Sequence, residues 1–156
     1  MKRFIHYGSD CFCRFKFNPV INGLPGETKP GINYSSDQKK RGGLWASPFG
    51  ENSQKDWKTW WEHHNDMALR QVRFIFWLTD DAKILRITSP EDIPADLLRS
   101  DCDNKSIDFE AMARQYSAMW VDYSVIEKLQ DSTFYGWECD TILVFDGKKV
   151  RYNPDD

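Results

Sequence analysis

Residues 72–78, VRFIFWL, are almost entirely apolar and are rich in the aromatic and β-branched residues that favour strands. A second apolar stretch, KILRI at residues 83–87, follows soon after, and Asp80 and Asp81 between the two stretches are typical of a turn. We therefore predict a pair of neighbouring strands joined by a tight connection, which is the usual connection of an antiparallel pair.

The rest of the chain continues this mixture of short elements. We expect further strands at residues 3–7, 12–17, 43–46, 119–121 and 141–145, and short helices after Ser53, Ser89 and Ser106 and at residues 124–129. Residues 18–43 are rich in glycine and proline and are expected to form a long loop, of the kind that closes over a pocket. Because strands and helices do not alternate regularly, the pattern favours an α+β fold with a mainly antiparallel sheet.

Length and charge narrow the classes of function. The chain has 156 residues, which suits a single domain over residues 1–156. Its net charge of −3 argues against a broad basic surface, although the basic run at residues 39–41 could meet a phosphate, so nucleic acid is neither implied nor excluded. Seven tryptophans are a high number for this length and indicate flat rings used in packing or stacking.

Cysteine spacing and hydropathy predict the compartment. The four cysteines, at positions 11, 13, 102 and 139, match none of the paired spacings of zinc sites, so we expect no metal. The amino terminus lacks an apolar leader, and no apolar run approaches the roughly 20 residues needed to span a bilayer. These features predict a reduced, cytoplasmic protein that does not enter a membrane.

Three short motifs carry the candidate chemistry: HYGS at residues 6–9, GGLWASPFG at residues 42–50, and YGWECDTILVF at residues 135–145. A histidine at the end of a strand, followed at once by glycine, can present its imidazole to a ligand. A tryptophan offers a flat face, and two acids precede the last apolar strand. Taken singly, each motif has a structural interpretation as a hydrogen-bonded histidine, a core tryptophan and a strand entrance.

In this order, the three motifs resemble those of the ADP-ribosyltransferase superfamily, whose members carry a histidine on the first strand, an aromatic residue on the second and an acid at a late strand. The resemblance implies a split β-sheet flanked by short helices and NAD+ as co-substrate, without a metal. It assigns catalysis to Asp140, Glu138 and His6, and cofactor binding to His6, Tyr7, Gly8, Ser9, Arg41, Gly43, Leu44, Trp45 and Ser47.

The sequence departs from the family pattern at two positions. Trp45 replaces the usual tyrosine but keeps a stacking face, and Asp140 stands where glutamate is more common. Breaking the bond between nicotinamide and ribose develops positive charge at the anomeric carbon, which a nearby carboxylate stabilises. We assign this role to Asp140 and a supporting role toward the acceptor to Glu138, while His6 orients the ribose hydroxyls.

The resemblance also implies a biological role and leaves alternatives open. Small transferases of this kind look like toxins or host-conflict effectors that modify a macromolecular acceptor, namely RNA, DNA or protein, and that have a neutralising antitoxin or immunity partner. An NAD-dependent RNA 2′-phosphotransferase shares the implied fold, but its phosphate-site arginines and histidines are not identified in this sequence. A catalytically inactive binding module is the alternative from a different class.

Overall fold

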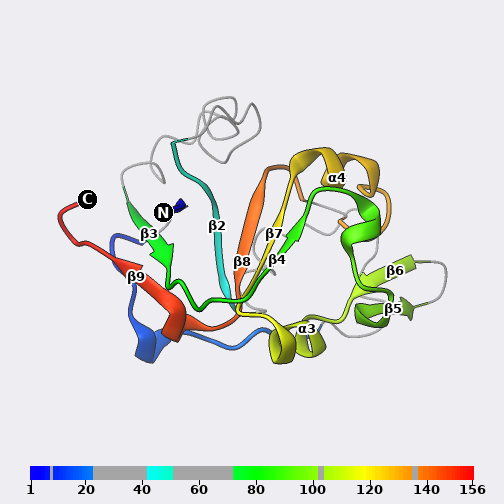
Figure 1. The fold of residues 1–156 in the computed structure, drawn as a ribbon, viewed down its shortest axis with the longest axis horizontal. Coiled ribbons are helices and arrows are strands. Elements are labelled where there is room, and N and C mark those ends of the chain that lie inside the picture. Colours follow the sequence, from blue (N-terminus) through cyan, green and yellow to red (C-terminus); the bar gives the residue numbers. More distant parts are fainter. Residues whose placement is uncertain (8, 23–41, 51–71, 102–103, 135–136) are drawn as a thin grey trace.

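The computed structural model describes residues 1–7, 9–22, 42–50, 72–101, 104–134 and 137–156 (Figure 1). Within these ranges the protein is α+β, with one large, mostly antiparallel sheet and few short helices. The expected fold class is therefore confirmed at this level. The expected helix after Ser53 and most of the expected loop at residues 18–43 lie outside the described residues.

The large sheet has seven strands in the order β4-β7-β8-β2-β1-β3-β9 (Figure 1). Only β4 and β7 run parallel, and the other neighbours are antiparallel. The strands are β1 Arg3–Tyr7, β2 Leu44–Pro48, β3 Arg73–Leu78, β4 Ile84–Ile87, β7 Ala118–Val121, β8 Thr141–Val144 and β9 Val150–Tyr152. Six of the seven strands predicted from the sequence appear here, some with shifted ends.

The paired stretch between β1 and β2 is short and ends at Ile5. Strand β1 pairs with β3 over five residue pairs, from Arg3↔Trp77 to Tyr7↔Arg73. It pairs with β2 at only two, Phe4↔Pro48 and Ile5↔Ser47. The halves β9-β3-β1 and β2-β8-β7-β4 therefore separate beyond Ile5.

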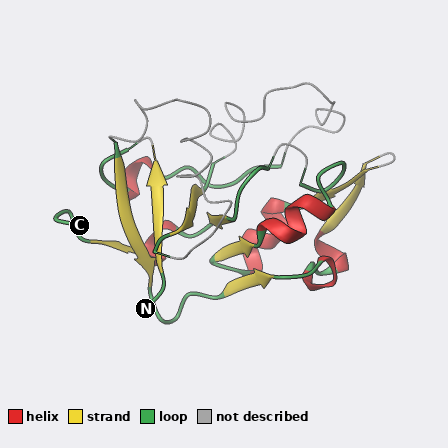
Figure 2. Ribbon diagram, turned by 90° about the horizontal axis from the view of Figure 1, so that it is seen from above, coloured by secondary structure: helices red, strands yellow, loops and turns green. Residues whose placement is uncertain are grey.

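The buried residues form two hydrophobic cores. The strand-side core joins β1, β3 and β9 to one face of β2 and β8, and includes the fully buried Phe4 and Phe76. The helix-side core joins the other face of β7 and β8 to helices α3 (Phe109–Gln115) and α4 (Tyr123–Lys128). Figure 2 shows both helices gathered at one end of the molecule. Burying a side chain such as Phe76 stabilises the fold by about 1.5–3 kcal/mol.

The remaining elements are short. They are the 3₁₀ helices η1 Arg14–Lys16, η3 Pro90–Asp92, η4 Ala95–Leu97 and η5 Gly147–Lys149, and the hairpin of β5 Leu98–Asp101 with β6 Asn104–Ile107. Strand β9 and this hairpin were not predicted from the sequence. Helix α3 begins later than predicted, since Ser106 lies in β6 and the carboxylate of Asp108 caps the helix by accepting from the Ala111 N–H.

Two further predictions were wrong. Residues 12–17 do not form a strand, because Arg14–Lys16 turn into η1. Strands β3 and β4 both form, but they do not pair with each other: β3 lies between β1 and β9, and β4 pairs in parallel with β7. The turn after β3 is held toward β9 instead, by the bond from the Thr79 N–H to the Lys149 carbonyl and the Lys149–Asp81 ion pair.

Candidate functional site

His6 lies at the point where β1 leaves β2. The ladder ends at Ile5↔Ser47, and the next polar link is made by the imidazole, whose Nδ1 lies 2.6 Å from the Trp45 carbonyl oxygen. Because a carbonyl oxygen can only accept, Nδ1 carries the hydrogen, and this assigns the tautomer. In the neutral ring Nε2 is then the acceptor. The imidazole thus bridges the two sheet halves where the backbone ladder has stopped.

Trp45 lies beside His6 through its backbone, but its ring is on the other face of the sheet. Its indole packs edge-on against Trp137, with ring centroids 5.0 Å apart, and belongs with the helix-side core. The imidazole instead contacts Phe74 of the strand-side core, at 5.3 Å between ring centroids. The indole Nε1 donates to the Gly42 carbonyl at 3.1 Å. A ligand that contacts both rings therefore has to enter the split between β1 and β2.

The acids lie at the start of β8, on the far side of β2 from β1. One carboxylate oxygen of Asp140 accepts from the Tyr123 N–H at 2.6 Å, at the first residue of α4. The Asp140 carbonyl accepts from the buried Ser47 hydroxyl at 3.0 Å. Glu138 is exposed. Asp140 thus joins β2, β8 and α4 at this corner.

The histidine and the acids do not lie at the same level of the sheet. Ala46 faces Ile142, so the same register extended by two residues puts Asp140 opposite Pro48. The histidine reaches β2 at Trp45, three residues away, which is about 10 Å along a regular strand. The structure therefore brings His6 to Trp45, and Asp140 to Ser47 and α4.

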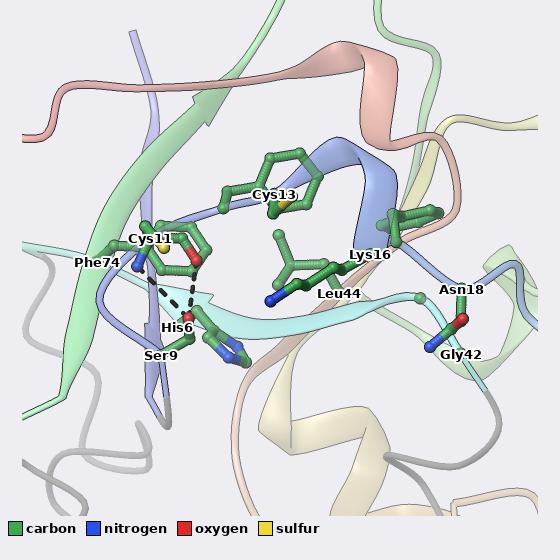
Figure 3. Close-up of a pocket in the computed structure, with 12 residues that line it drawn as sticks. His6, Ser9, Cys11, Cys13, Lys16, Asn18, Gly42, Leu44 and Phe74 are labelled. Atoms are coloured by element: carbon green, nitrogen blue, oxygen red, sulfur yellow. Dashed lines mark hydrogen bonds between the residues drawn. The ribbon is translucent and has the colours of Figure 1, made fainter.

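A pocket of about 270 Å³ opens beside His6 (Figure 3). Four predicted cofactor residues line it: His6, Ser9, Gly43 and Leu44. The other described lining residues are Cys11, Phe12, Cys13, Lys16, Phe17, Asn18, Gly42 and Phe74. The predicted residues Tyr7, Trp45, Ser47, Glu138 and Asp140 are not among the described lining residues, and Gly8 and Arg41 lie outside the described part of the chain.

The glycines of the second motif have a packing role. Gly42 and Gly43 adopt φ angles of 80° and 76°, in the left-handed region that favours glycine. The Gly43 N–H donates to the Asn18 carbonyl at 2.7 Å. A Cβ added at Gly43 would lie 2.6 Å from a methyl carbon of Leu143. Gly43 therefore has a packing role against Asn18 and Leu143, while it also lines the pocket, and its assignment to cofactor binding stays a prediction.

Sequence reasoning missed the pocket residues that follow β1. Phe12, Lys16 and Asn18 line the pocket because η1 turns this segment back toward His6, whereas the predicted strand would have carried it away. Phe74 lines the pocket from β3. The signal that could have identified them is their position in the sequence, because residues that soon follow the end of a strand are candidates to lie beside that end.

Cations lie near the acidic corner. Arg86 stacks on the Trp120 ring, 3.8 Å from its centroid, and forms an ion pair of 2.5 Å with Asp122. Asp122 directly precedes Tyr123, the backbone partner of Asp140. Partial burial, together with repulsion from Arg86, lowers the pKa of Lys2. This corner is therefore a network of opposite charges, with positive groups close to the start of α4.

In the described ranges, no three His, Cys, Asp or Glu side chains gather in a way that could hold a metal ion. The helices found there are too short or too polar to cross a bilayer. Comparison of the chain with protein-family models, curated proteins and solved structures finds no match. Any assignment of function therefore depends on the three motifs and the geometry around them.

Proposed function

We propose that the protein is a mono-ADP-ribosyltransferase that moves ADP-ribose from NAD+ to a macromolecular acceptor, as a toxin or host-conflict effector acting in the cytoplasm. One observation carries the proposal. The histidine, tryptophan and acid motifs are far apart in the sequence, yet they belong to β1, β2 and the start of β8, which are neighbours in one sheet. The separation of the sheet after Ile5 is also what the family resemblance implies for the core.

The orientation of His6 suits the task of positioning the cofactor. Because Nδ1–H is bonded to the Trp45 carbonyl, the ring is held in one orientation with Nε2 as its acceptor. A ribose hydroxyl can donate to that nitrogen, which fixes the sugar without any transfer of a proton. His6 also lines the pocket, so a ligand bound there lies within reach of the imidazole.

The carboxylate acts on the bond that breaks. Cleavage between nicotinamide and ribose leaves positive charge on the anomeric carbon, and a nearby carboxylate stabilises that charge in the transition state. Nicotinamide departs with the bonding electrons, and the nucleophile of the acceptor forms the new bond and loses its proton. We assign the first role to Asp140 and assistance to the acceptor to Glu138. NAD+ then has to extend from the His6 pocket, at the split between β1 and β2, about 10 Å along the sheet to the start of β8, which lies level with the paired residues Phe4 and Pro48.

Release of nicotinamide from NAD+ tests the proposal, measured with RNA, DNA and protein fractions as acceptors. We compare His6→Ala with His6→Asn, because the asparagine amide nitrogen can replace Nδ1 as donor to Trp45 while Nε2 is lost. Both variants should lose at least about tenfold in rate. Only His6→Ala should also lose about 1 kcal/mol of stability, because the bond between the strands is missing.

Three other outcomes point elsewhere. A rate within twofold of the natural protein in both variants removes His6 from the site. Binding of NAD+ without release of nicotinamide favours the inactive binding module. Turnover that requires a 2′-phosphorylated RNA favours the RNA 2′-phosphotransferase.

A further inference from the structure

The pocket beside His6 contains one charged side chain that the proposed mechanism does not use. Lys16, on η1, extends into the pocket toward His6 (Figure 3). Among the described residues that line the pocket, Lys16 is the sole charged group. It forms no ion pair with any residue that the structure describes. An ammonium group in this position attracts an anion.

The rest of the lining suits a flat ring. Phe74 packs against the His6 ring at 5.3 Å and against Phe12 at 6.3 Å, both measured between centroids. Phe17 completes this wall, 6.1 Å from Phe12. The pocket thus combines aromatic faces with a single cation, a pairing that fits a ligand with both a ring and a phosphate.

The volume limits the size of this ligand. Pockets for drug-sized molecules are roughly 300–1,000 Å³, and this one is about 270 Å³. It is therefore suited to one ring, one sugar and one phosphate, and not to a whole dinucleotide. The other half of a dinucleotide would then lie outside the pocket, which agrees with a cofactor that continues toward β8.

We propose that Lys16 binds a phosphate of the ligand, so that the pocket selects the phosphorylated nicotinamide nucleoside half of a dinucleotide over the same nucleoside without phosphate. The identification of the ring as nicotinamide rests on the proposed function. The expectation of a phosphate rests on the lining of the pocket. Residues 39–41, considered from the sequence for a phosphate contact, lie outside the described residues, so that expectation stays a prediction.

Two ligands that differ by one phosphate test the inference. Calorimetry on the full chain compares nicotinamide mononucleotide with nicotinamide riboside, for the natural protein and for Lys16→Met, Lys16→Arg and Lys105→Met. We expect the natural protein to bind the mononucleotide about tenfold more tightly than the riboside, since one charge-assisted contact at an exposed lysine is worth roughly this factor. Lys16→Met should remove the preference without changing riboside binding, and Lys16→Arg should keep it.

Lys105→Met is the matched control, since Lys105 is also exposed but lies on β6. It should leave the preference unchanged. Salt gives a test that needs no variant: raising it from about 50 to about 500 mM should weaken mononucleotide binding and spare the riboside. Retention of the full preference in a folded Lys16→Met protein, or a preference insensitive to salt, overturns the inference.

A third probe separates this inference from the proposed function. ADP carries phosphates but no nicotinamide. If ADP binds in a Lys16-dependent way while neither nicotinamide compound binds, the phosphate site stands and the transferase proposal fails. If the mononucleotide and the riboside bind equally well, the Lys16 inference fails and the transferase proposal stands. If none of the three probes binds, both fail.

Discussion

His6 and Asp140 are both motif residues at the ends of strands, yet their surroundings differ. The His6 imidazole donates to the Trp45 carbonyl at 2.6 Å and also lines a pocket. The Asp140 carboxylate has a backbone partner at the same distance, the Tyr123 N–H, but is not among the described residues of the pocket. Both side chains are therefore held by a hydrogen bond to the backbone, but of the two only His6 borders the described pocket.

The surroundings of a motif residue separate a purely structural role from a role that leaves room for chemistry. An anchored side chain that also borders an open volume has a structural role and room for a chemical one. An anchored side chain at a helix start is explained by the fold alone, because a carboxylate that accepts from the first N–H groups of a helix stabilises that helix. The pocket thus leaves room for a ligand beside His6. At Asp140, an experiment has to separate a role in folding from a role in catalysis.

Replacing Asp140 should give the largest effect and test the acid end directly. Asp140→Asn keeps an oxygen that can accept from the Tyr123 N–H but removes the negative charge. We expect nicotinamide release to fall by about 100-fold, from the loss of an electrostatic stabilisation of roughly 3 kcal/mol, while stability changes by less than about 0.5 kcal/mol. Asp140→Ala should lose the activity and also about 1 kcal/mol of stability. Rates and urea unfolding curves measure both quantities.

The matched control is Asp108→Asn, the same chemical change at the cap of α3, away from the proposed site. It should leave the rate unchanged. If Asp140→Asn also keeps its rate, Asp140 serves only the fold, and the catalytic role passes to Glu138. If Asp140 is the catalytic acid, Glu138→Gln should spare hydrolysis of NAD+ by water and depress transfer to the acceptor.

The sequence predicted those features that depend on local residue types. The alternation and apolarity of residues 3–7 and 141–145 place β1 and β8, and the histidine and acids at their ends follow directly. The helical turn at Tyr123–Lys128 was also predicted, within a residue. Each of these elements is specified by its own side chains, and this explains why a single sequence was enough.

Features that depend on distant partners were not predicted. Strand β3 was expected to pair with β4, but β1 and β9 offer it partners on both edges, and β9 is only three residues long. The segment at residues 12–17 alternates like a strand, yet η1 brings Lys16 to the pocket. The opposite facing of Trp45 and His6 was likewise hidden, because it follows from the register of β1 and β2, in which Ile5 faces Ser47.

A change at Trp45 should have a smaller effect on the rate of nicotinamide release, and it tests the histidine end of the proposed site. Trp45→Phe and Trp45→Leu both lose the bond from Nε1 to the Gly42 carbonyl, so each should lose about 1 kcal/mol of stability or more. Only Trp45→Leu also loses the flat face. If the cofactor stacks on this face from the split, Trp45→Leu should lose about tenfold in rate and Trp45→Phe less than threefold. Equal rates in the two variants, per folded molecule, would make Trp45 a core residue only.

The smallest effect is expected at Asp81, which lies in the half that contains β3 and β9 and serves to separate the scaffold from the site. The hydrogen bond from Lys149, followed by one from Thr79, lowers the pKa of Asp81 to about 2 from its ordinary value of 3.8. A carboxylate with a lowered pKa in the folded state stabilises the fold above its unfolded pKa, and this contribution is lost as the pH falls. The difference in stability between the natural protein and Asp81→Asn should therefore be constant above about pH 5, shrink between about pH 4 and pH 2, and vanish below that. Urea unfolding at a series of pH values measures this difference. Asp80→Asn, the same change one residue earlier in the turn, is the control that should keep the natural pH profile.

Because Asp81 is exposed and belongs to neither end of the proposed site, nicotinamide release by Asp81→Asn at neutral pH should be unchanged. A lower rate in Asp81→Asn would mean that the β3–β9 edge influences the His6 pocket. The comparison with Asp140 would then have to include the whole half β9-β3-β1, and not His6 alone.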